Sequence, residues 1–121
     1  MTFPYDISVI VPIFNSETFI EPCMECLLGQ TVGFPRMEVL LVNDGSTDGS
    51  EDLCRRFAQQ YENVNLISQE NQGVSAARNA GIRAAQGKYI LFLDADDTIS
   101  ANAVEEITLS LIHISEPTRL G

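Results

Sequence analysis

Three aspartates within four residues are the strongest chemical signal in the chain. Asp94, Asp96 and Asp97 directly follow the apolar run at residues 89–93. Carboxylates this close repel one another unless a cation lies between them. In an extended chain Asp94 and Asp96 point to the same side, and hard oxygen ligands suit Mg²⁺ or Mn²⁺. These residues therefore favour a divalent-cation site at Asp94 and Asp96, with a solvated turn capped by Asp97 as the alternative.

Two further polar residues are placed where they could hold a ligand. Asp44 stands between Asn43 and Gly45, and its carboxylate could accept a hydrogen bond from an amide or imide N–H while the glycine allows close approach. An Asx turn that caps a helix explains the same residues equally well. Arg78 lies among small residues and could pair with the acidic cluster or a phosphate, or it could face solvent.

A regular alternation of strands and helices must position these side chains. Because each predicted strand is an unbroken apolar run, we expect the strands to be buried on both faces. The fold class is α/β, a Rossmann-like parallel sheet of about four strands with flanking helices. Strands are predicted at residues 7–11, 39–42, 64–67 and 89–93, and helices around residues 19–28, 53–61, 74–85 and 103–111.

Polar or turn-forming residues follow every predicted strand. In open parallel sheets, ligands bind outside the carboxyl ends of the strands. The four strand ends should therefore open onto one edge and form one site. The residues concerned are 12–15, 43–46, 69–73 and 94–97.

Composition and charge exclude several classes of function. The chain has 121 residues, of which 45% are apolar, as in one small globular domain. Its net charge of −10 argues against nucleic acid as a partner and against a polybasic membrane anchor. No apolar run approaches the ~20 residues that span a bilayer, and no secretory signal is visible, so we expect a cytoplasmic location.

Other residue types narrow the chemistry further. Cys23 and Cys26 form a C-x-x-C pair, but they lie in an apolar helical pattern and are expected to pack as reduced thiols in the core. No dinucleotide-binding glycine motif and no phosphate-binding loop occur. A Ser-His-Asp triad is improbable because His113 is the only histidine.

The last helical pattern is lost at about Leu109, and no fifth strand follows. We predict that residues 1–108 form the domain and that residues 109–121 form a divergent tail foreign to it. An ordinary divergent helix end is the alternative.

Four ordered segments resemble the family 2 glycosyltransferases of GT-A fold. The resemblance runs from Ile7 to about Glu106. It implies an inverting transfer of a sugar from a UDP-, GDP- or dTDP-sugar to an acceptor hydroxyl. The segments are V-I-V-P-I-F-N at 9–15, E-V-L-L-V-N-D-G-S-T-D at 38–48, N-Q-G-V-S-A-A-R-N-A-G-I at 71–82 and L-D-A-D-D at 93–97.

The resemblance also implies roles for the residues that bind the nucleotide. Pro12, Phe14 and Asn15 would lie along the nucleoside, with Phe14 stacked on the base. Asp44 would hydrogen-bond the base, and Arg78 would line the nucleotide pocket.

Asp94-Ala95-Asp96 corresponds to the D-x-D motif of the family. Asp96 would bind Mn²⁺ or Mg²⁺, and Asp94 would lie near the ribose or reach the ion through water. The family's catalytic base lies in the second half of its domain, beyond the end of this chain, so no catalytic residue is assigned.

The resemblance therefore indicates the donor-binding half of an incomplete GT-A domain, with an unpaired apolar sheet edge. It specifies neither the sugar nor the acceptor, which could be a glycan, a lipid or a protein. The parent protein could act at the inner face of the membrane, although this chain contains no expected span.

Two other functions stay open. The chain could bind a nucleotide without turnover, as a fragment or a partner-dependent module. It could also be a phosphatase of the haloacid dehalogenase type, because D-A-D-D-T at residues 94–98 fits D-x-D-x-T, with Asp94 as nucleophile and Asp96 as acid and base. That motif normally opens its domain, whereas three predicted strands precede it here.

Overall fold

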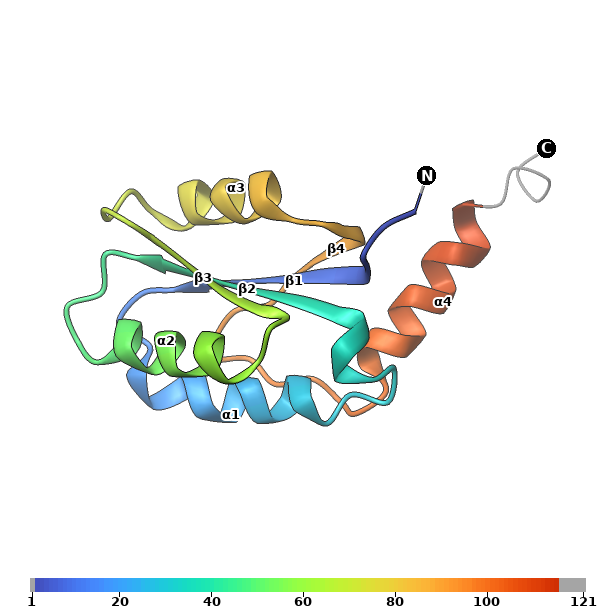
Figure 1. Cartoon of the computed structure of the whole chain (residues 1–121), viewed down its shortest axis with the longest axis horizontal. Helices are drawn as coiled ribbons and strands as arrows, with labels where there is room; N and C mark the ends of the chain where they lie inside the picture. Colours follow the sequence, from blue (N-terminus) through green and yellow to red (C-terminus); the bar gives the residue numbers. More distant parts are fainter. Residues whose placement is uncertain (1, 116–121) are drawn as a thin grey trace.

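Four parallel strands form the central sheet of the protein (Figure 1). The computed structural model describes residues 2–115. Within these residues the strand order is β3-β2-β1-β4. Strands β2 and β3 are added on one side of β1, and β4 then pairs with the other side of β1. This reversal creates a topological switch point beside β1, where parallel sheets bind ligands. The strands are β1 (Tyr5–Ile13), β2 (Met37–Asp44), β3 (Val64–Gln69) and β4 (Gly87–Phe92).

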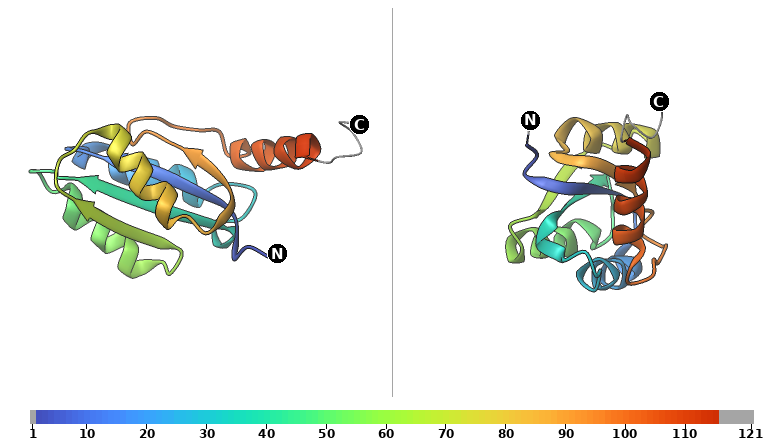
Figure 2. Two further views of the ribbon diagram at one scale, coloured as in Figure 1. Left: turned by 90° about the horizontal axis from the view of Figure 1, so that it is seen from above. Right: turned by 90° about the vertical axis from the view of Figure 1, so that its right-hand side faces the viewer.

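Helices cover both faces of the sheet. In Figure 1, α1 (Glu17–Leu28) and α2 (Ser50–Gln60) lie below the sheet, and α3 (Val74–Ala84) lies above it. A short 3₁₀ helix, η1 (Phe34–Arg36), precedes β2. The last helix, α4 (Ala103–Ser115), extends beyond one end of the sheet (Figure 2). In the described part of the chain, no helix is long and apolar enough to cross a membrane.

The two central strands are buried on both faces. One face of β1 and β2 packs against α1 and α2 through a cluster that includes Val9, Leu41 and Met24. The other face packs against Ala77 of α3 through residues such as Ile10. The expectation of strands buried on both faces is correct for β1 and β2.

That expectation is wrong for β3 and β4, because these are the edge strands of the sheet. In β4 half-buried and exposed positions alternate. Tyr89 and Leu91 join the core, whereas Ile90 and Phe92 are 41% and 43% exposed on the opposite face. These exposed side chains agree with the expected apolar edge.

The cysteines behave as core residues. Cys23 and Cys54 are buried, Cys26 is half-buried, and all three are free thiols. Burial, reinforced by neighbouring acidic groups, raises the pKa of Cys23 and of Cys54 to about 12. Both thiols are therefore protonated at neutral pH and poor nucleophiles.

The helix α4 continues through the predicted boundary at residue 109 and ends at Ser115. Residues 116–121 lie outside the described part of the chain. The division into a domain at residues 1–108 and a foreign tail at residues 109–121 stays a prediction.

Candidate functional site

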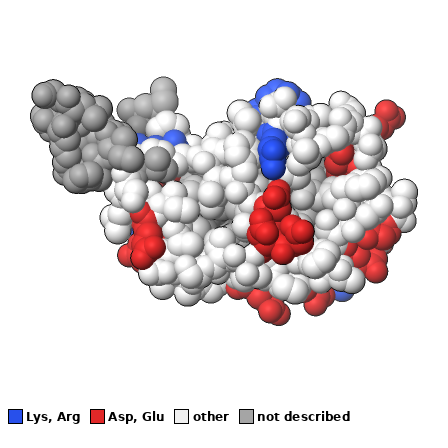
Figure 3. Space-filling model, turned by 180° about the vertical axis from the view of Figure 1, so that it is seen from behind, with Lys and Arg blue, Asp and Glu red and all other residues white. Residues whose placement is uncertain are grey.

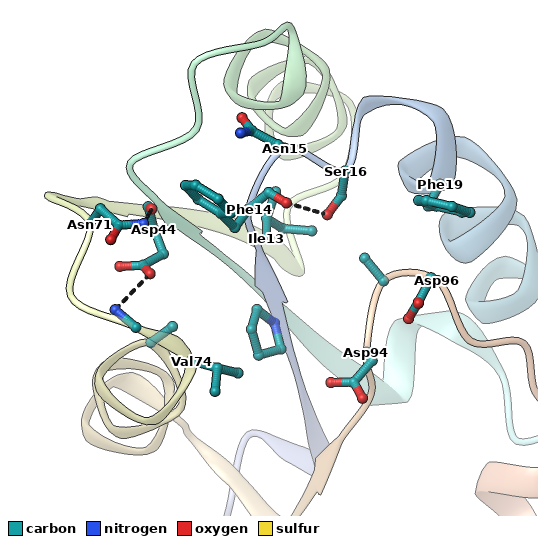
Figure 4. A pocket seen from close by; sticks show the side chains of 14 residues that line it. Ile13, Phe14, Asn15, Ser16, Phe19, Asp44, Asn71, Val74, Asp94 and Asp96 are labelled. Atoms are coloured by element: carbon teal, nitrogen blue, oxygen red, sulfur yellow. Dashed lines mark hydrogen bonds between the residues drawn. The ribbon is translucent and has the colours of Figure 1, made fainter.

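A pocket of about 440 Å³ opens at the carboxyl ends of the strands (Figure 4). Its walls come from the segments that follow all four strands, as the parallel arrangement predicts. Six of the seven residues proposed from sequence line it, and only Arg78 does not. The six are Pro12, Phe14, Asn15, Asp44, Asp94 and Asp96.

The two ends of the pocket differ in chemistry. Phe14 and Val74 lie on the side of Asp44, whereas Asp94 and Asp96 lie on the opposite side (Figure 4). Phe14 and Val74 are each 50% exposed. An aromatic ring and an aliphatic side chain at one end can contact a planar apolar group, while the other end is acidic.

The acidic end contains three exposed carboxylates. One oxygen from each of Asp94, Asp96 and Asp97 lies within 4.8 Å of the others. A turn in which the Asp97 backbone N–H donates to the Asp94 carbonyl, at 3.0 Å, brings them together. Three hard anionic oxygen donors fit Mg²⁺ or Mn²⁺. Asp97 belongs to this acidic cluster but does not line the pocket.

Arg78 projects from α3 toward the acidic cluster. Its Nη2 lies 3.5 Å from Oδ1 of Asp94, and its guanidinium carbon lies 5.7 Å from the centre of the Phe92 ring. Figure 3 shows basic atoms directly beside a compact acidic group on this face. Of the two partners considered for Arg78, the structure provides the acidic cluster.

The carboxylate of Asp44 binds both ends of the loop between β3 and α3. Oδ1 accepts hydrogen bonds from Gln69 Nε2 at 3.0 Å and from the Gln72 backbone N–H at 2.8 Å, and Oδ2 accepts from the Gly73 N–H at 2.9 Å. Burial opposes ionisation of Asp44, but these three donors outweigh it and lower its pKa. Asp44 therefore stays ionised and also holds the residue that precedes α3.

The turn after β2 approaches this loop closely. Gly45 has a φ of +72°, and a Cβ atom there would lie 2.6 Å from the Asn71 backbone nitrogen. The side chain of Asn71 donates to the Asp44 carbonyl oxygen at 3.1 Å. The predicted close approach at Gly45 is thus made by the protein's own backbone.

Asn15 joins the loop after β1 to the loop after β2. It adopts a left-handed conformation with a φ of +47°. Its Oδ1 accepts the Thr47 N–H at 2.8 Å, and its own N–H donates to Ser46 Oγ at 3.0 Å. Asn15 lines the pocket as predicted, but its side-chain oxygen is already engaged within the protein.

Among the pocket-lining residues that were not proposed from the sequence are Phe19, Asn71 and Val74. Phe19 shares the four-residue spacing of the core positions in α1, yet it is 47% exposed. Its place in the first turn after a strand end is the signal that could have identified it. Val74 and Asn71 lie in the segment after β3 that already marked the site.

Comparison with known proteins places these features in a family. The model for glycosyl transferase family 2 matches residues 8–113. The minor teichoic acid biosynthesis protein GgaB of Bacillus subtilis is 44% identical over 107 residues, covering 88% of this chain and 12% of that protein. Glycosyltransferase GlyA of Streptococcus pneumoniae is 36% identical over 115 residues, covering 95% of this chain and 16% of that protein.

Solved structures show the same fold. S. aureus TarS 1-349 in complex with UDP-GlcNAc has a TM-score of 0.78 and 29% identity, covering 86% of this chain and 30% of that one. Mannosyltransferase PcManGT from Pyrobaculum calidifontis in complex with GDP-Man and Mn²⁺ has a TM-score of 0.75 and 28% identity, covering 97% and 34%. The chain spans less than two-fifths of the length of each of these relatives. Its sheet matches part of the GT-A-like fold of these structures, and the chain belongs to glycosyl transferase family 2.

Proposed function

We propose that this chain binds the nucleotide-sugar donor of a glycosyltransferase that transfers a sugar, with inversion, to an acceptor hydroxyl. The observation that carries the proposal is the two-ended pocket at the strand ends. One end holds the clustered carboxylates of Asp94 and Asp96, and the other holds the apolar side chains of Phe14 and Val74 beside Asp44. Family membership supports it, as do the UDP-GlcNAc and GDP-Man complexes of the structural relatives.

The donor would lie along the pocket with its base at the Phe14 end. Phe14 would stack on the base, Pro12 and Asn15 would flank the nucleoside, and Asp44 would accept a hydrogen bond from the base. The diphosphate would then reach the acidic end. This orientation rests on the clustered oxygens of Asp94, Asp96 and Asp97, which can share a cation beside a diphosphate. Asp44, at the other end, is a single carboxylate that already accepts three hydrogen bonds from the protein.

The acidic cluster would hold a divalent cation, Mn²⁺ or Mg²⁺, through Asp96 with Asp94 in support. The fit rests on three hard oxygen donors within 4.8 Å of one another, and a relative is complexed with Mn²⁺. When bound, such an ion offsets the charge that develops on the leaving diphosphate. Arg78, next to Asp94, would orient that carboxylate and contribute positive charge beside the phosphates.

We assign no catalytic base. Transfer requires a group that removes the proton of the acceptor hydroxyl, and no described residue is proposed for it. Nucleotide binding without turnover is therefore the second candidate for the chain by itself. The family match covers the D-A-D-D-T segment, so the phosphatase alternative is dropped.

We further propose a cytoplasmic location, with the parent protein peripheral at the inner face of the membrane. The free thiols of Cys23, Cys26 and Cys54 support a reducing compartment. The acceptor, whether glycan, lipid or protein, is left open.

Calorimetric titration of UDP, GDP and dTDP, with and without Mn²⁺, tests donor binding. We expect Mn²⁺-dependent binding of at least one nucleotide, and loss of that binding in Asp96→Ala. Asp52→Ala is the matched control, because Asp52 is an exposed carboxylate in the first turn of α2, outside the pocket. A chain that is folded by circular dichroism and binds none of the three nucleotides would contradict the proposal.

Turnover is measured separately by release of free nucleotide from the nucleotide sugar. Sugar transfer or donor hydrolysis that is lost in Asp96→Ala would establish an enzyme. Binding without either reaction would establish the second candidate.

A further inference from the structure

The protein itself occupies three of the acceptor positions of the Asp44 carboxylate. A carboxylate offers about four such positions, two on each oxygen. Oδ1 accepts from both Gln69 and Gln72, so its two positions are filled. Within the described residues Oδ2 accepts only from Gly73. One acceptor position therefore stays open, and it belongs to Oδ2.

Gln69 owes its place beside Asp44 to the sheet. The register of β2 and β3 pairs Asp44 with Gln69 directly. Because a carboxylate can only accept, the Gln69 amide presents its nitrogen to Oδ1 at 3.0 Å. The side chain of Gln69 is thus the one removable donor on Oδ1, since the other is a backbone N–H.

Asn71 brings an amide donor to the same end of the pocket as Asp44. Asn71 uses one N–H of its amide to reach the Asp44 carbonyl oxygen at 3.1 Å, and an amide nitrogen carries a second N–H. Both residues line the same end of the pocket as Phe14 (Figure 4). This end therefore offers a flat group one acceptor position on Asp44 and one donor on Asn71.

We propose that Gln69, by filling Oδ1 of Asp44, makes the pocket selective for a nucleotide whose base presents a single imide N–H, namely uracil or thymine. The inference rests on the proposed function and names the base of its donor. Uracil and thymine place one N–H between two carbonyl oxygens. The N–H can donate to the open acceptor of Asp44 while a neighbouring carbonyl oxygen accepts from Asn71.

The other bases match less well. Guanine presents N1–H and an amino group side by side and needs two acceptor positions, so one of its donors would be left unpaired against the filled Oδ1. Cytosine and adenine place a ring-nitrogen acceptor where the imide N–H would be, facing the Asp44 carboxylate. An unpaired polar group in a partly desolvated site weakens binding by about tenfold.

The experiment compares UDP, GDP and inosine diphosphate on the purified chain with Mn²⁺ by calorimetry. Inosine diphosphate equals GDP without the amino group, so this pair removes the difference in size between purine and pyrimidine. We expect UDP to bind about tenfold more tightly than GDP, and inosine diphosphate to bind several-fold more tightly than GDP. These two ratios are measured on the wild-type chain and do not depend on how well a variant folds.

Gln69→Met then tests the residue itself. Methionine preserves the length of the side chain and leaves one position of Oδ1 open. We expect the preference for inosine diphosphate over GDP to disappear in Gln69→Met. Ser68→Ala is the control, because Ser68 is the preceding residue and its hydroxyl donates to Glu51, away from the pocket.

The outcomes separate this inference from the proposed function. If none of the three nucleotides binds to a folded chain, the proposed function fails and this inference fails with it. If GDP binds as tightly as UDP and inosine diphosphate, the proposed function stands and the inference is wrong. An unchanged preference in folded Gln69→Met would also overturn the role of Gln69.

Discussion

Glu17 and Asp48 cap each other's helices. Oδ2 of Asp48 accepts the backbone N–H of Glu17, the first residue of α1, at 3.3 Å. In return, the carboxylate of Glu17 accepts the backbone N–H of Gly49, which precedes α2. Since α1 and α2 follow the two central strands, this exchange joins the loop that carries Asn15 to the turn that follows Asp44.

Removing the Asp48 side chain should destabilise the protein. Its carboxylate also accepts the Ser50 N–H at 2.9 Å, so it serves the first turns of both helices. We expect Asp48→Ala to lower the free energy of unfolding in urea by about 1–2 kcal/mol, as loss of a helix cap does. Asp52→Ala is the control and should change it by less than about 0.5 kcal/mol. Equal effects of the two substitutions would contradict the double-cap interpretation.

Stability should also depend on the ionisation of Asp44. Its pKa in the folded chain is lowered below the ordinary value of 3.8, because the three hydrogen-bond donors outweigh the cost of burial. A lowered folded-state pKa stabilises the protein above the unfolded pKa, and this contribution is lost as the pH falls through the folded pKa. We expect Asp44 to contribute equally to the free energy of unfolding in urea at pH 7 and at pH 5. Below about pH 4 this contribution should decrease.

The variant Asp44→Asn isolates this contribution. It should be less stable than the wild type at pH 7, because an amide can no longer accept all three hydrogen bonds. The difference between the two proteins should shrink as the pH falls from 5 toward 3. A difference that is constant over this range would show that ionised Asp44 does not stabilise the fold.

Arg78 should weaken the binding of Mn²⁺ to the acidic cluster when no nucleotide is present. Its guanidinium lies 3.5 Å from Asp94 and offsets negative charge in the acidic cluster. We expect Arg78→Gln to raise the affinity for Mn²⁺ alone about threefold, a small effect because the pair is exposed to solvent. The same variant should bind the nucleotide less tightly when Mn²⁺ is present.

Arg83→Gln is the control for this measurement, because Arg83 is exposed in the last turn of α3 and outside the acidic cluster. Both affinities can be followed by titration calorimetry. A fall in the affinity for Mn²⁺ alone in Arg78→Gln would contradict the prediction.

The close packing of α3 on β1 should make Gly81 hard to replace. A Cβ atom at Gly81 would lie 2.5 Å from Cγ2 of Ile10. We expect Gly81→Ala to destabilise the protein by about 1–3 kcal/mol through overpacking, although alanine favours a helix by about 1 kcal/mol. Ser75→Ala on the exposed side of α3 should be neutral or slightly stabilising. Thermal unfolding measures both, and a higher melting temperature in Gly81→Ala would refute the packing argument.

Much of the architecture could be predicted because it depends on local pattern. Apolar runs predicted three of the strands, weak alternation at residues 64–67 predicted the other, and the polar residues after each strand predicted one shared edge. The structure confirms both, with Phe14, Asp44, Asn71 and Asp94 brought into one pocket from four different strand ends. Parallel strands bring their carboxyl ends to one edge of the sheet, whereas the strand order decides which of these ends lie side by side.

The edges of the sheet could not be predicted in this way. The apolar run of β4 has the composition of a buried strand, yet Ile90 and Phe92 are exposed. Burial of a strand depends on which strands and helices pack beside it, and that is set by the order β3-β2-β1-β4.

The sequence by itself therefore determined the fold class, the family and the residues that approach the pocket, because apolar periodicity and ordered motifs are local properties of the chain. Tertiary structure alone decided that Arg78 meets Asp94, that Gln69 fills one oxygen of Asp44, and that Glu17 and Asp48 exchange caps. Each of these contacts joins residues 16 or more positions apart. Such contacts form only after the strands have adopted their order and register, which local pattern does not specify.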